Sequence, residues 1–178
     1  MVAEAALEQT EAGLVPRGEG WFVVNTREAR WYEHPEFGCW CRYEGEPGFP
    51  ELGINVSLLE PGKPACMYHG ESNQEDFLVL AGECLLLVEG EERRLEAWDF
   101  VHCPAWTEHV FVGAGSGPCA ILAVGVRGDD EQLRYPVSEL AQRYGGSVLE
   151  ETQSGEEAYA RFPKPTERPY REGDLPGW

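Results

Sequence analysis

The chain has 178 residues, of which 42% are hydrophobic, and it carries a formal net charge of −18. This length fits one domain with a single substantial core. The excess of 32 Asp and Glu over 14 Lys and Arg argues against nucleic acid as a partner, because phosphate contacts need a basic patch. It also argues against binding to an anionic membrane surface. We interpret the acidity as a solubility feature.

Targeting signals are not evident in the sequence. No stretch reaches the roughly 18 consecutive apolar residues that span a bilayer. The N-terminal segment MVAEAALEQTEAG is acidic and lacks the basic-then-apolar plan of a signal peptide. We therefore expect a cytoplasmic location. The six cysteines form no C-x-x-C pair, so we expect small buried hydrophobes rather than a zinc ribbon.

Residues 1–19 are predicted to form a loose N-terminal arm that can include a short Ala/Glu helix. From Trp21 onward, short apolar runs are separated by Gly, Pro and Asn. The runs are WFVVN, FGCWCRY, INVSLL, ACMYH, FLVLA, CLLLVEG, FVHC, HVFVG and CAILAVGV. Short runs bounded by turn residues are typical of strands. Many such strands without helical periods between them indicate a β-sandwich or barrel.

Two glycine-containing connections in this region predict hairpins. AGE at 81–83 separates FLVL from CLLLV, and EGEE at 89–92 separates CLLLV from the next run. Gly90 can adopt a positive φ in the second of these turns. The run CLLLV is apolar on both strand faces. One face is therefore expected to line a barrel, and the other to pack against a second sheet or a partner subunit.

The character of the sequence changes again after Arg127. PVSELAQRYGG predicts a short helix with Ser138 as a possible N-cap and Gly145 at its end. A second, weak helix is predicted from Gly155 to Ala160. The last stretch, RFPKPTERPYREGDLPGW, is rich in proline, so we expect an extended strap or a mobile tail.

Two short segments on separate predicted strands carry candidate metal ligands. ACMYH delivers His69 at its end, and Glu71 stands two residues further on, a spacing that puts both side chains on one strand face. Glu75 is the fourth residue after Glu71. In DFVHCPAWTEH, a strand ends at Pro104 and a short turn presents His109. Imidazole and carboxylate groups together suit borderline divalent metals such as iron, manganese, nickel or zinc.

Residues 59–126 resemble the cupin family, whose first motif is G(X)5HXH(X)3,4E(X)6G. PGKPACMYHGESNQEDFLVLAG matches this motif with one extra residue between its first glycine and His69. Glu71 stands where the second histidine of the motif is expected. Glu75 and Gly82 keep their mutual spacing.

The second cupin motif, G(X)5PXG(X)2H(X)3N, is similar to WDFVHCPAWTEHVFVG. Pro104 and His109 keep the spacing of this motif. Trp98, Trp106 and Gly113 replace the expected Gly, Gly and Asn. The motifs are degenerate, so the resemblance points to the fold more clearly than to the reaction.

The resemblance implies an all-β, cupin-type double-stranded β-helix, which is a jelly-roll barrel, with an N-terminal strand extension and short C-terminal helices. The barrel with its N-terminal strands is expected over residues 20–127, between the arm at 1–19 and the helices and strap at 128–178. The family's habit and the doubly apolar strand lead us to expect a homodimer.

By resemblance, the family's metal positions fall on His69, Glu71, Glu75 and His109. If Glu71 turns away, the other three make a set of two histidines and one carboxylate, which leaves open positions for dioxygen or substrate on a non-haem iron. If Glu71 binds as well, the formal charge with a divalent ion is about zero, which favours manganese or another oxygen-tolerant metal. The identity of the divalent metal, among Fe, Mn, Zn and Ni, stays open.

The resulting hypothesis is a metal-binding cupin that acts on a small molecule as a dioxygenase or an isomerase. The alternatives are a non-catalytic cupin that binds or senses a small ligand, and a structural protein whose metal only fastens the barrel. Three other residues are of interest. His102 is expected to pack outside the barrel or in a subunit contact, Trp106 is a candidate for the pocket mouth, and His34 is expected in a loop.

Overall fold

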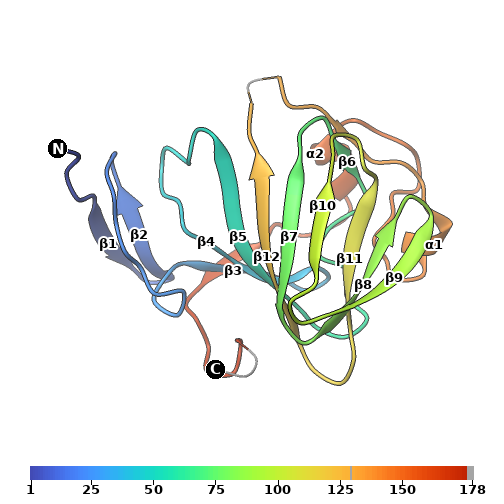
Figure 1. Cartoon of the computed structure of the whole chain (residues 1–178), viewed down its shortest axis with the longest axis horizontal. Coiled ribbons are helices and arrows are strands. Elements are labelled where there is room, and N and C mark those ends of the chain that lie inside the picture. The colour runs from blue at the N-terminus through green and yellow to red at the C-terminus, as the bar shows by residue number, and fades with distance from the viewer. Residues whose placement is uncertain (129, 176–178) are drawn as a thin grey trace.

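Two β-sheets face each other in the computed structural model, which describes residues 1–128 and 130–175 (Figure 1). The end of the predicted C-terminal strap, residues 176–178, lies outside the described residues. The main sheet has the strand order β10-β7-β12-β5-β4-β3-β14, and the second sheet has the order β11-β8-β9. This arrangement confirms the predicted all-β fold, a cupin-type jelly-roll barrel.

The strands of the first half are β1 (Ala6–Thr10), β2 (Gly13–Arg17), β3 (Trp31–His34), β4 (Gly38–Arg42), β5 (Leu52–Leu59), β6 (Gly70–Glu71) and β7 (Glu75–Ala81). Those of the second half are β8 (Glu83–Val88), β9 (Glu91–Glu96), β10 (Phe100–Cys103), β11 (His109–Ala114), β12 (Cys119–Val126), β13 (Leu133–Arg134) and β14 (Thr166–Arg168). The helices are α1 (Glu139–Gln142) and α2 (Gly155–Tyr159). No helix in the described ranges has the length and apolar composition to cross a membrane.

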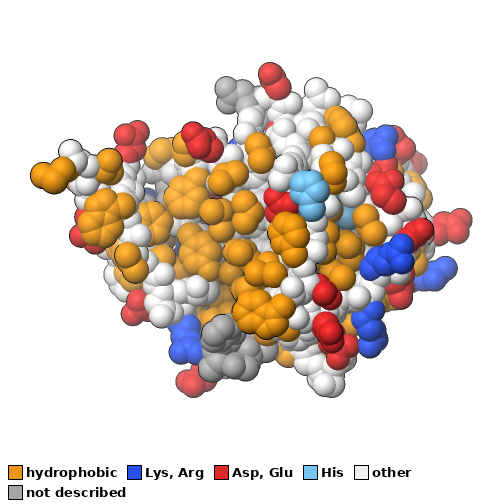
Figure 2. All heavy atoms as spheres, in the orientation of Figure 1, with side chains coloured by type: hydrophobic (Ala, Val, Ile, Leu, Met, Phe, Trp, Pro, Cys, Tyr) orange, Lys and Arg blue, Asp and Glu red, His pale blue; other side chains and the backbone are white. Residues whose placement is uncertain are grey.

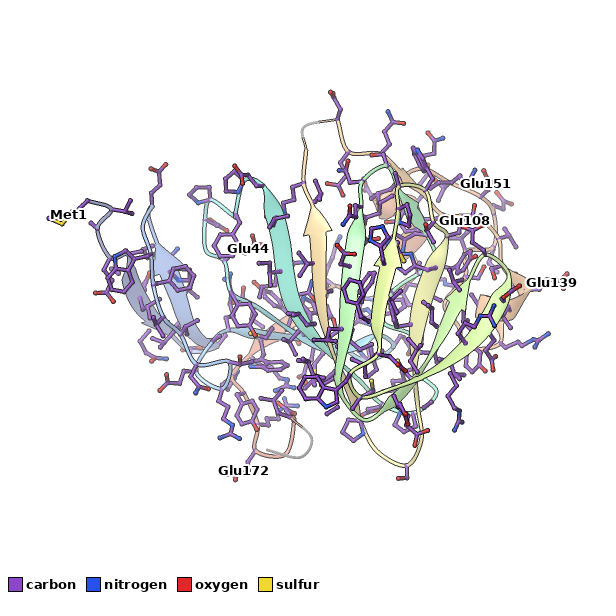
Figure 3. The ribbon with its side chains drawn as sticks, viewed as in Figure 1. Met1, Glu44, Glu108, Glu139, Glu151 and Glu172 are labelled. Atoms are coloured by element: carbon purple, nitrogen blue, oxygen red, sulfur yellow. The ribbon has the colours of Figure 1, made fainter. Side chains whose placement is uncertain are left out.

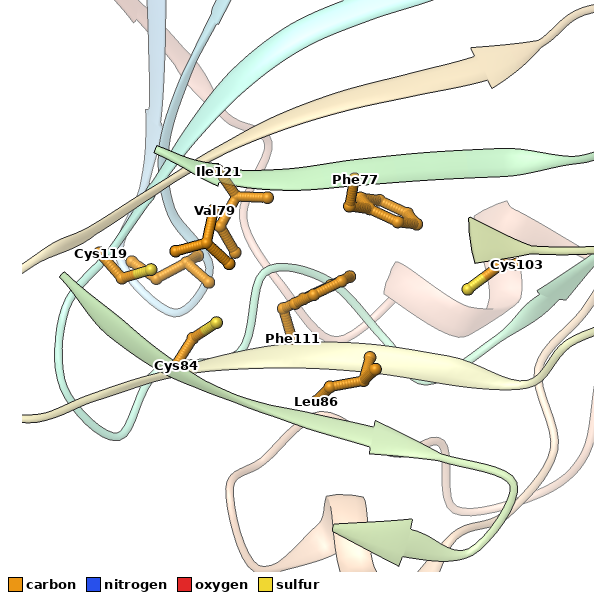
Figure 4. Packing of buried hydrophobic residues seen from close by; sticks show 9 residues of the cluster. Phe77, Val79, Cys84, Leu86, Cys103, Phe111, Cys119 and Ile121 are labelled. Carbon is orange, nitrogen blue, oxygen red and sulfur yellow. The ribbon is translucent and has the colours of Figure 1, made fainter. Parts of the chain in front are cut away.

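The core of the barrel lies between the two sheets (Figure 4). It consists of Leu59, Phe77, Val79, Cys84, Leu86, Cys103, Phe111, Cys119 and Ile121. Alternation along each strand turns every second side chain inward, and each buried large apolar side chain contributes about 1.5–3 kcal/mol. The cavity described below begins where this cluster ends, at Phe77 and Phe111.

The doubly apolar run CLLLV is buried on both faces, as its sequence predicts. Cys84 and Leu86 point into the barrel. Leu87 packs on the other face against Ala141 of α1, with Tyr144 beside it. The cover of this face is therefore a helix of the same chain, and not a second sheet or a partner subunit.

One of the two predicted hairpins is confirmed and the other is wrong. β8 and β9 are joined by Glu89 and Gly90, with φ angles of 49° and 78°. Two successive positive φ values match the twist of paired strands. By contrast, β7 and β8 belong to different sheets, so AGE is a crossover and not a hairpin turn. At Gly82, φ is 77°, and a Cβ atom would lie 2.5 Å from the carbonyl oxygen of Pro118.

The N-terminal residues form a β-hairpin, so the prediction of a loose arm with a short helix is wrong. β1 and β2 pair antiparallel from Ala6 to Arg17. Val15 is buried, and the N–H of Leu14 donates to the carbonyl oxygen of Glu28 at 2.7 Å. The Ala/Glu composition favours a helix only locally, and these tertiary contacts override it.

The C-terminal helices lie where the sequence predicts them. Ser138 caps α1, and its Oγ accepts a hydrogen bond from the N–H of Ala141 at 3.2 Å. Gly145 follows α1 with a φ of 76°. The strap packs as extended chain, since β14 pairs with β3 and adds a strand to the main sheet.

Candidate metal centre

His69 and His109 form a cross-strand pair. The N–H of His109 donates to the carbonyl oxygen of His69 at 2.8 Å, and the N–H of His69 donates back at 3.2 Å. Directly opposed residues present their side chains on the same face. The imidazole rings consequently lie side by side with centroids 5.2 Å apart, and both residues are buried.

The backbone selects the tautomer of both histidines. Nδ1 of His69 donates to the carbonyl oxygen of Met67 at 2.8 Å, and Nδ1 of His109 donates to that of Thr107 at 3.0 Å. A carbonyl oxygen only accepts, so in the neutral imidazole the ring hydrogen sits on Nδ1 and the lone pair on Nε2. This is the arrangement in which metal-binding histidines are held by a partner on their second nitrogen.

Glu75 comes to this pair from the opposite sheet. Its Oε2 lies 3.6 Å from Nε2 of His109 and 4.0 Å from Nε2 of His69. The three ligand atoms all lie within 4.8 Å of one another. Bonds of about 2.1 Å to a divalent ion bring neighbouring ligand atoms to about 3 Å from each other, so a small inward movement would complete the geometry. The donor set and its spacing fit a divalent metal.

Glu71 approaches from one side of this group. Its Oε1 lies 3.3 Å from Nε2 of His69, but it does not belong to the set of mutually close ligand atoms. The side chains of Glu71 and Glu75 are only 16% and 15% exposed. Other acidic side chains, such as Glu139, Glu151 and Glu172, project from the periphery (Figure 3). Glu71 and Glu75 thus differ from these peripheral acidic residues, because their carboxylates are largely buried beside an imidazole ring.

The electrostatics of the metal-free site make it a poor place for two negative charges. Burial raises the pKa of Glu75 to about 7, and the charge of Glu71 acts in the same direction. Burial, helped by the neighbouring His69, lowers the pKa of His109 to about 4. Burial also opposes a charge on His69, yet Cys66 and the two carboxylates raise its pKa above the usual range. A metal ion that binds here must displace protons.

The site opens into a cavity of about 1020 Å³ inside the barrel. Phe77 and Phe111 line it next to the histidines, and Tyr159 and Phe162 line it from the C-terminal segment. Tyr135 stacks on His69 with ring centroids 5.8 Å apart. The volume is at the upper end of the range of small-molecule sites, which is roughly 300–1,000 Å³.

Three residues discussed from the sequence lie in different places. His102 is exposed on the outer face of the main sheet, where its Nδ1 lies 2.7 Å from Oδ1 of Asp76. Trp106 is 44% exposed and is not among the cavity residues. His34 is not in a loop, since it ends β3 and lines the cavity, with its Nε2 3.0 Å from the carbonyl oxygen of Pro163.

The part of the cavity remote from the histidines was missed by sequence reasoning. It is lined by Trp40 and Arg42 of β4, Asn55 and Ser57 of β5, and Lys164 of the strap. A signal exists in FGCWCRY. The alternation that packs Cys41, and partly Cys39, into a core cluster on one strand face turns Trp40 and Arg42 to the other.

Comparisons with known proteins agree with this fold. No protein of curated function matches the chain. A sugar phosphate isomerase of the cupin superfamily from Silicibacter pomeroyi DSS-3 is 25% identical with a TM-score of 0.48. The match covers 61% of this chain and 66% of the isomerase, so the chain spans just under two thirds of that protein.

Two further solved structures are similar in fold. The polyketide cyclase RemF from Streptomyces resistomycificus is 17% identical with a TM-score of 0.52, over 60% of this chain and 79% of the cyclase. A predicted oxalate decarboxylase from Thermotoga maritima is 18% identical with a TM-score of 0.53, over 59% of this chain and 98% of that protein. The family model of the cupin domain matches residues 55–125, which include both histidines and both carboxylates of the site. Residues 55–125 therefore form a cupin domain, which confirms the resemblance to the cupin superfamily over this part of the chain.

Proposed function

We propose that this chain is a metal-dependent enzyme that acts on a small polar molecule inside the barrel, with a divalent ion held by His69, Glu75 and His109. One observation carries the proposal. Both imidazoles have Nδ1 fixed by a backbone carbonyl, while both Nε2 atoms face the same carboxylate oxygen, at 3.6 and 4.0 Å.

The surroundings favour a functional site over a structural one. Structural zinc sites are closed by four protein ligands, whereas catalytic sites keep a position open. Here three ligands converge, and the cavity of about 1020 Å³ lies directly next to them. A metal held only to fasten the barrel would not need this space.

When bound, a divalent metal would act as a Lewis acid on a hydroxyl or carbonyl oxygen of the substrate. A side chain of this protein would then transfer the proton between substrate atoms. Glu71 is buried beside His69 and is not required by the three-ligand set, so its carboxylate can take a proton from a substrate carbon and return it. Phe77 and Phe111 line this end of the cavity with apolar surface. These features favour an isomerisation by proton transfer.

Dioxygen-dependent oxidation is the second candidate. It is favoured by the set of two histidines and one carboxylate, which resembles the ligand set of non-haem iron oxygenases. The same donor atoms suit Fe, Mn, Ni and Zn, so metal analysis of the purified protein has to decide among them.

The proposal also includes a cytoplasmic location, where the six free thiols would stay reduced.

The metal centre is tested by titrating the metal-free protein with Zn²⁺ and Mn²⁺. The parent is expected to bind one equivalent, and His69→Ala and His109→Ala to lose it. His102→Ala is the matched control, because His102 lies on the outer face of the sheet. Full metal binding by both site variants would refute the proposed centre.

The reaction class is tested on the metal-loaded parent with a panel of hydroxy and keto compounds. Deuterium uptake at carbon from D₂O, followed by NMR, would support isomerisation, and oxygen consumption would support oxidation. Metal binding with neither signal would instead favour the non-catalytic cupin that binds or senses a ligand.

A further inference from the structure

The register of the main sheet connects the metal centre to an arginine at the other end of the cavity. Across four neighbouring strands, Arg42 pairs with Asn55, Asn55 with Ala123, and Ala123 with Phe77. Paired residues share a face, and all four line the cavity. Glu75 stands two residues before Phe77 on the same face. From a strand spacing of about 4.8 Å, the backbones at Arg42 and Glu75 are about 15 Å apart.

Arg42 is free to bind a ligand. Among the ion pairs of residues 1–128 and 130–175, none includes Arg42. The nearby Glu44 is already held by Arg127, whose two terminal nitrogens each lie 2.7 Å from its carboxylate. The guanidinium of Arg42 instead lies 5.5 Å from the ring centroid of Tyr32, which stacks on Trp40. This aromatic support orients the guanidinium without neutralising its charge.

The charges along the cavity are divided between its two ends. Glu71 and Glu75 stand at the metal end, where an anionic group would be repelled by any carboxylate that the metal does not neutralise. Arg42 and Lys164 line the remote part, together with one carboxylate, Glu156. Lys164 also takes part in no ion pair among residues 1–128 and 130–175. Two unpaired cations in one cavity contrast with an overall charge of −18.

Between the two ends, the cavity is lined by two polar side chains and one small apolar side chain. Ser57 and Asn55 supply hydrogen-bonding groups, and the Oγ of Ser57 donates to Oδ1 of Asn55 at 3.1 Å. Ala123 leaves room in the middle of the row because its side chain is a single methyl group. A molecule that reaches from the metal centre to Arg42 would pass these side chains.

We propose that the substrate carries an oxyanion group, a carboxylate or phosphate, which Arg42 binds at the end of the cavity opposite the metal centre. The inference rests on the proposed function, because that function places the reacting oxygen at the other end. Arg42 is then a specificity-determining residue. Its planar guanidinium can give two parallel hydrogen bonds to a carboxylate or phosphate.

The experiment uses three probes of similar chain length with the Zn²⁺-loaded protein: adipate, 6-phosphonohexanoate and hexanoate. By calorimetric titration, the parent is expected to bind at least one of the two probes that carry a second anionic group about 10-fold more tightly than hexanoate. Which of the two is preferred distinguishes a carboxylate subsite from a phosphate subsite. Arg42→Gln is expected to abolish the preference while leaving Zn²⁺ affinity unchanged.

Arg143→Gln is the matched control, because Arg143 is exposed beyond α1 and should not affect the preference. If Arg42→Gln does not fold, Arg42→Lys should keep part of the preference, because it retains the charge but not the two parallel bonds. A parent without preference, or a preference that persists in Arg42→Gln, overturns the oxyanion subsite alone. A parent that takes up no Zn²⁺ overturns the metal centre and, with it, this inference.

Discussion

His69 and His109 exchange two backbone hydrogen bonds, at 3.2 and 2.8 Å, so the strand ladder and not the side chains sets the distance between their rings. Glu75 enters from the opposite sheet and therefore closes the site across the barrel. The ligand set is thus one rigid pair and one separate carboxylate. Removal of a ligand side chain should leave the other two close to their places.

This geometry predicts different roles for the two carboxylates. Glu75→Gln should weaken Zn²⁺ binding by about 100-fold or more, because it replaces the oxygen that faces both Nε2 atoms by a neutral ligand. Glu71→Gln should weaken Zn²⁺ binding much less than Glu75→Gln does, because the Glu71 carboxylate lies beside Nε2 of His69 but outside the three-ligand set. The two isosteric variants serve as controls for each other in one calorimetric series. Equal losses in both would make Glu71 a fourth ligand.

Metal affinity should depend on pH through Glu75. Its pKa of about 7 means that a proton competes with the metal in neutral and acidic solution. The affinity for Zn²⁺ should therefore fall by about tenfold or more for each pH unit below 7, since His69, whose pKa is also raised, must lose its proton as well. His109, with a pKa of about 4, should add to the slope only at still lower pH. Titrations between pH 5 and pH 8 check this, and a flat affinity below pH 7 would contradict it.

The same carboxylate should make the metal-free protein less stable at high pH. A raised folded-state pKa stabilises the protonated form, so this contribution is complete below about pH 4.5 and is lost as pH rises through 7. The free-energy change is on the order of 3 kcal/mol. Metal-free Glu75→Gln should therefore gain stability over the parent between pH 5 and pH 8 in urea unfolding. A constant difference between the two proteins across this range would show that Glu75 does not titrate there.

The motif spacing carried much of the information about the site. Glu75 and Gly82, and likewise Pro104 and His109, stand at distances that imply a cupin barrel, and the structure brings both histidines together with Glu75. Trp98 and Trp106 replace glycines of the motif, yet the backbone keeps φ values of 78° and 68° there. Both tryptophans therefore adopt the left-handed backbone conformation that glycine favours, which costs about 1–2 kcal/mol for each non-glycine residue.

What sequence reasoning missed depends on contacts between distant strands. A glycine at position 82 indicates a sharp change of direction, but it does not tell whether the next strand pairs with the last one or crosses to another sheet. Arg42 and His34 lie outside the motifs and reach the cavity only because β3, β4 and β5 extend the main sheet. Such register is set by long-range pairing, which no local pattern encodes.

The outer face of the main sheet is apolar, and we expect a second copy of the chain to cover it (Figure 2). Trp98 and Phe100 protrude from it and are 70% and 65% exposed. Beside them on this face is a groove of about 590 Å³, whose lining includes Tyr43, Leu80 and Leu122. A protruding pair and a groove on one surface suit a two-fold dimer, in which each copy supplies both halves of the contact.

The dimer should be visible by light scattering during size-exclusion chromatography. Trp98→Ser with Phe100→Ser should shift the protein to the monomer by removing the protruding side chains. Leu149→Ser removes an equally exposed apolar side chain from the loop between the helices and should leave the dimer intact. Because each copy carries a net charge of −18, added salt should tighten the dimer by screening repulsion. A monomeric parent at high salt would contradict the expected dimer, and the apolar face would then need a different occupant.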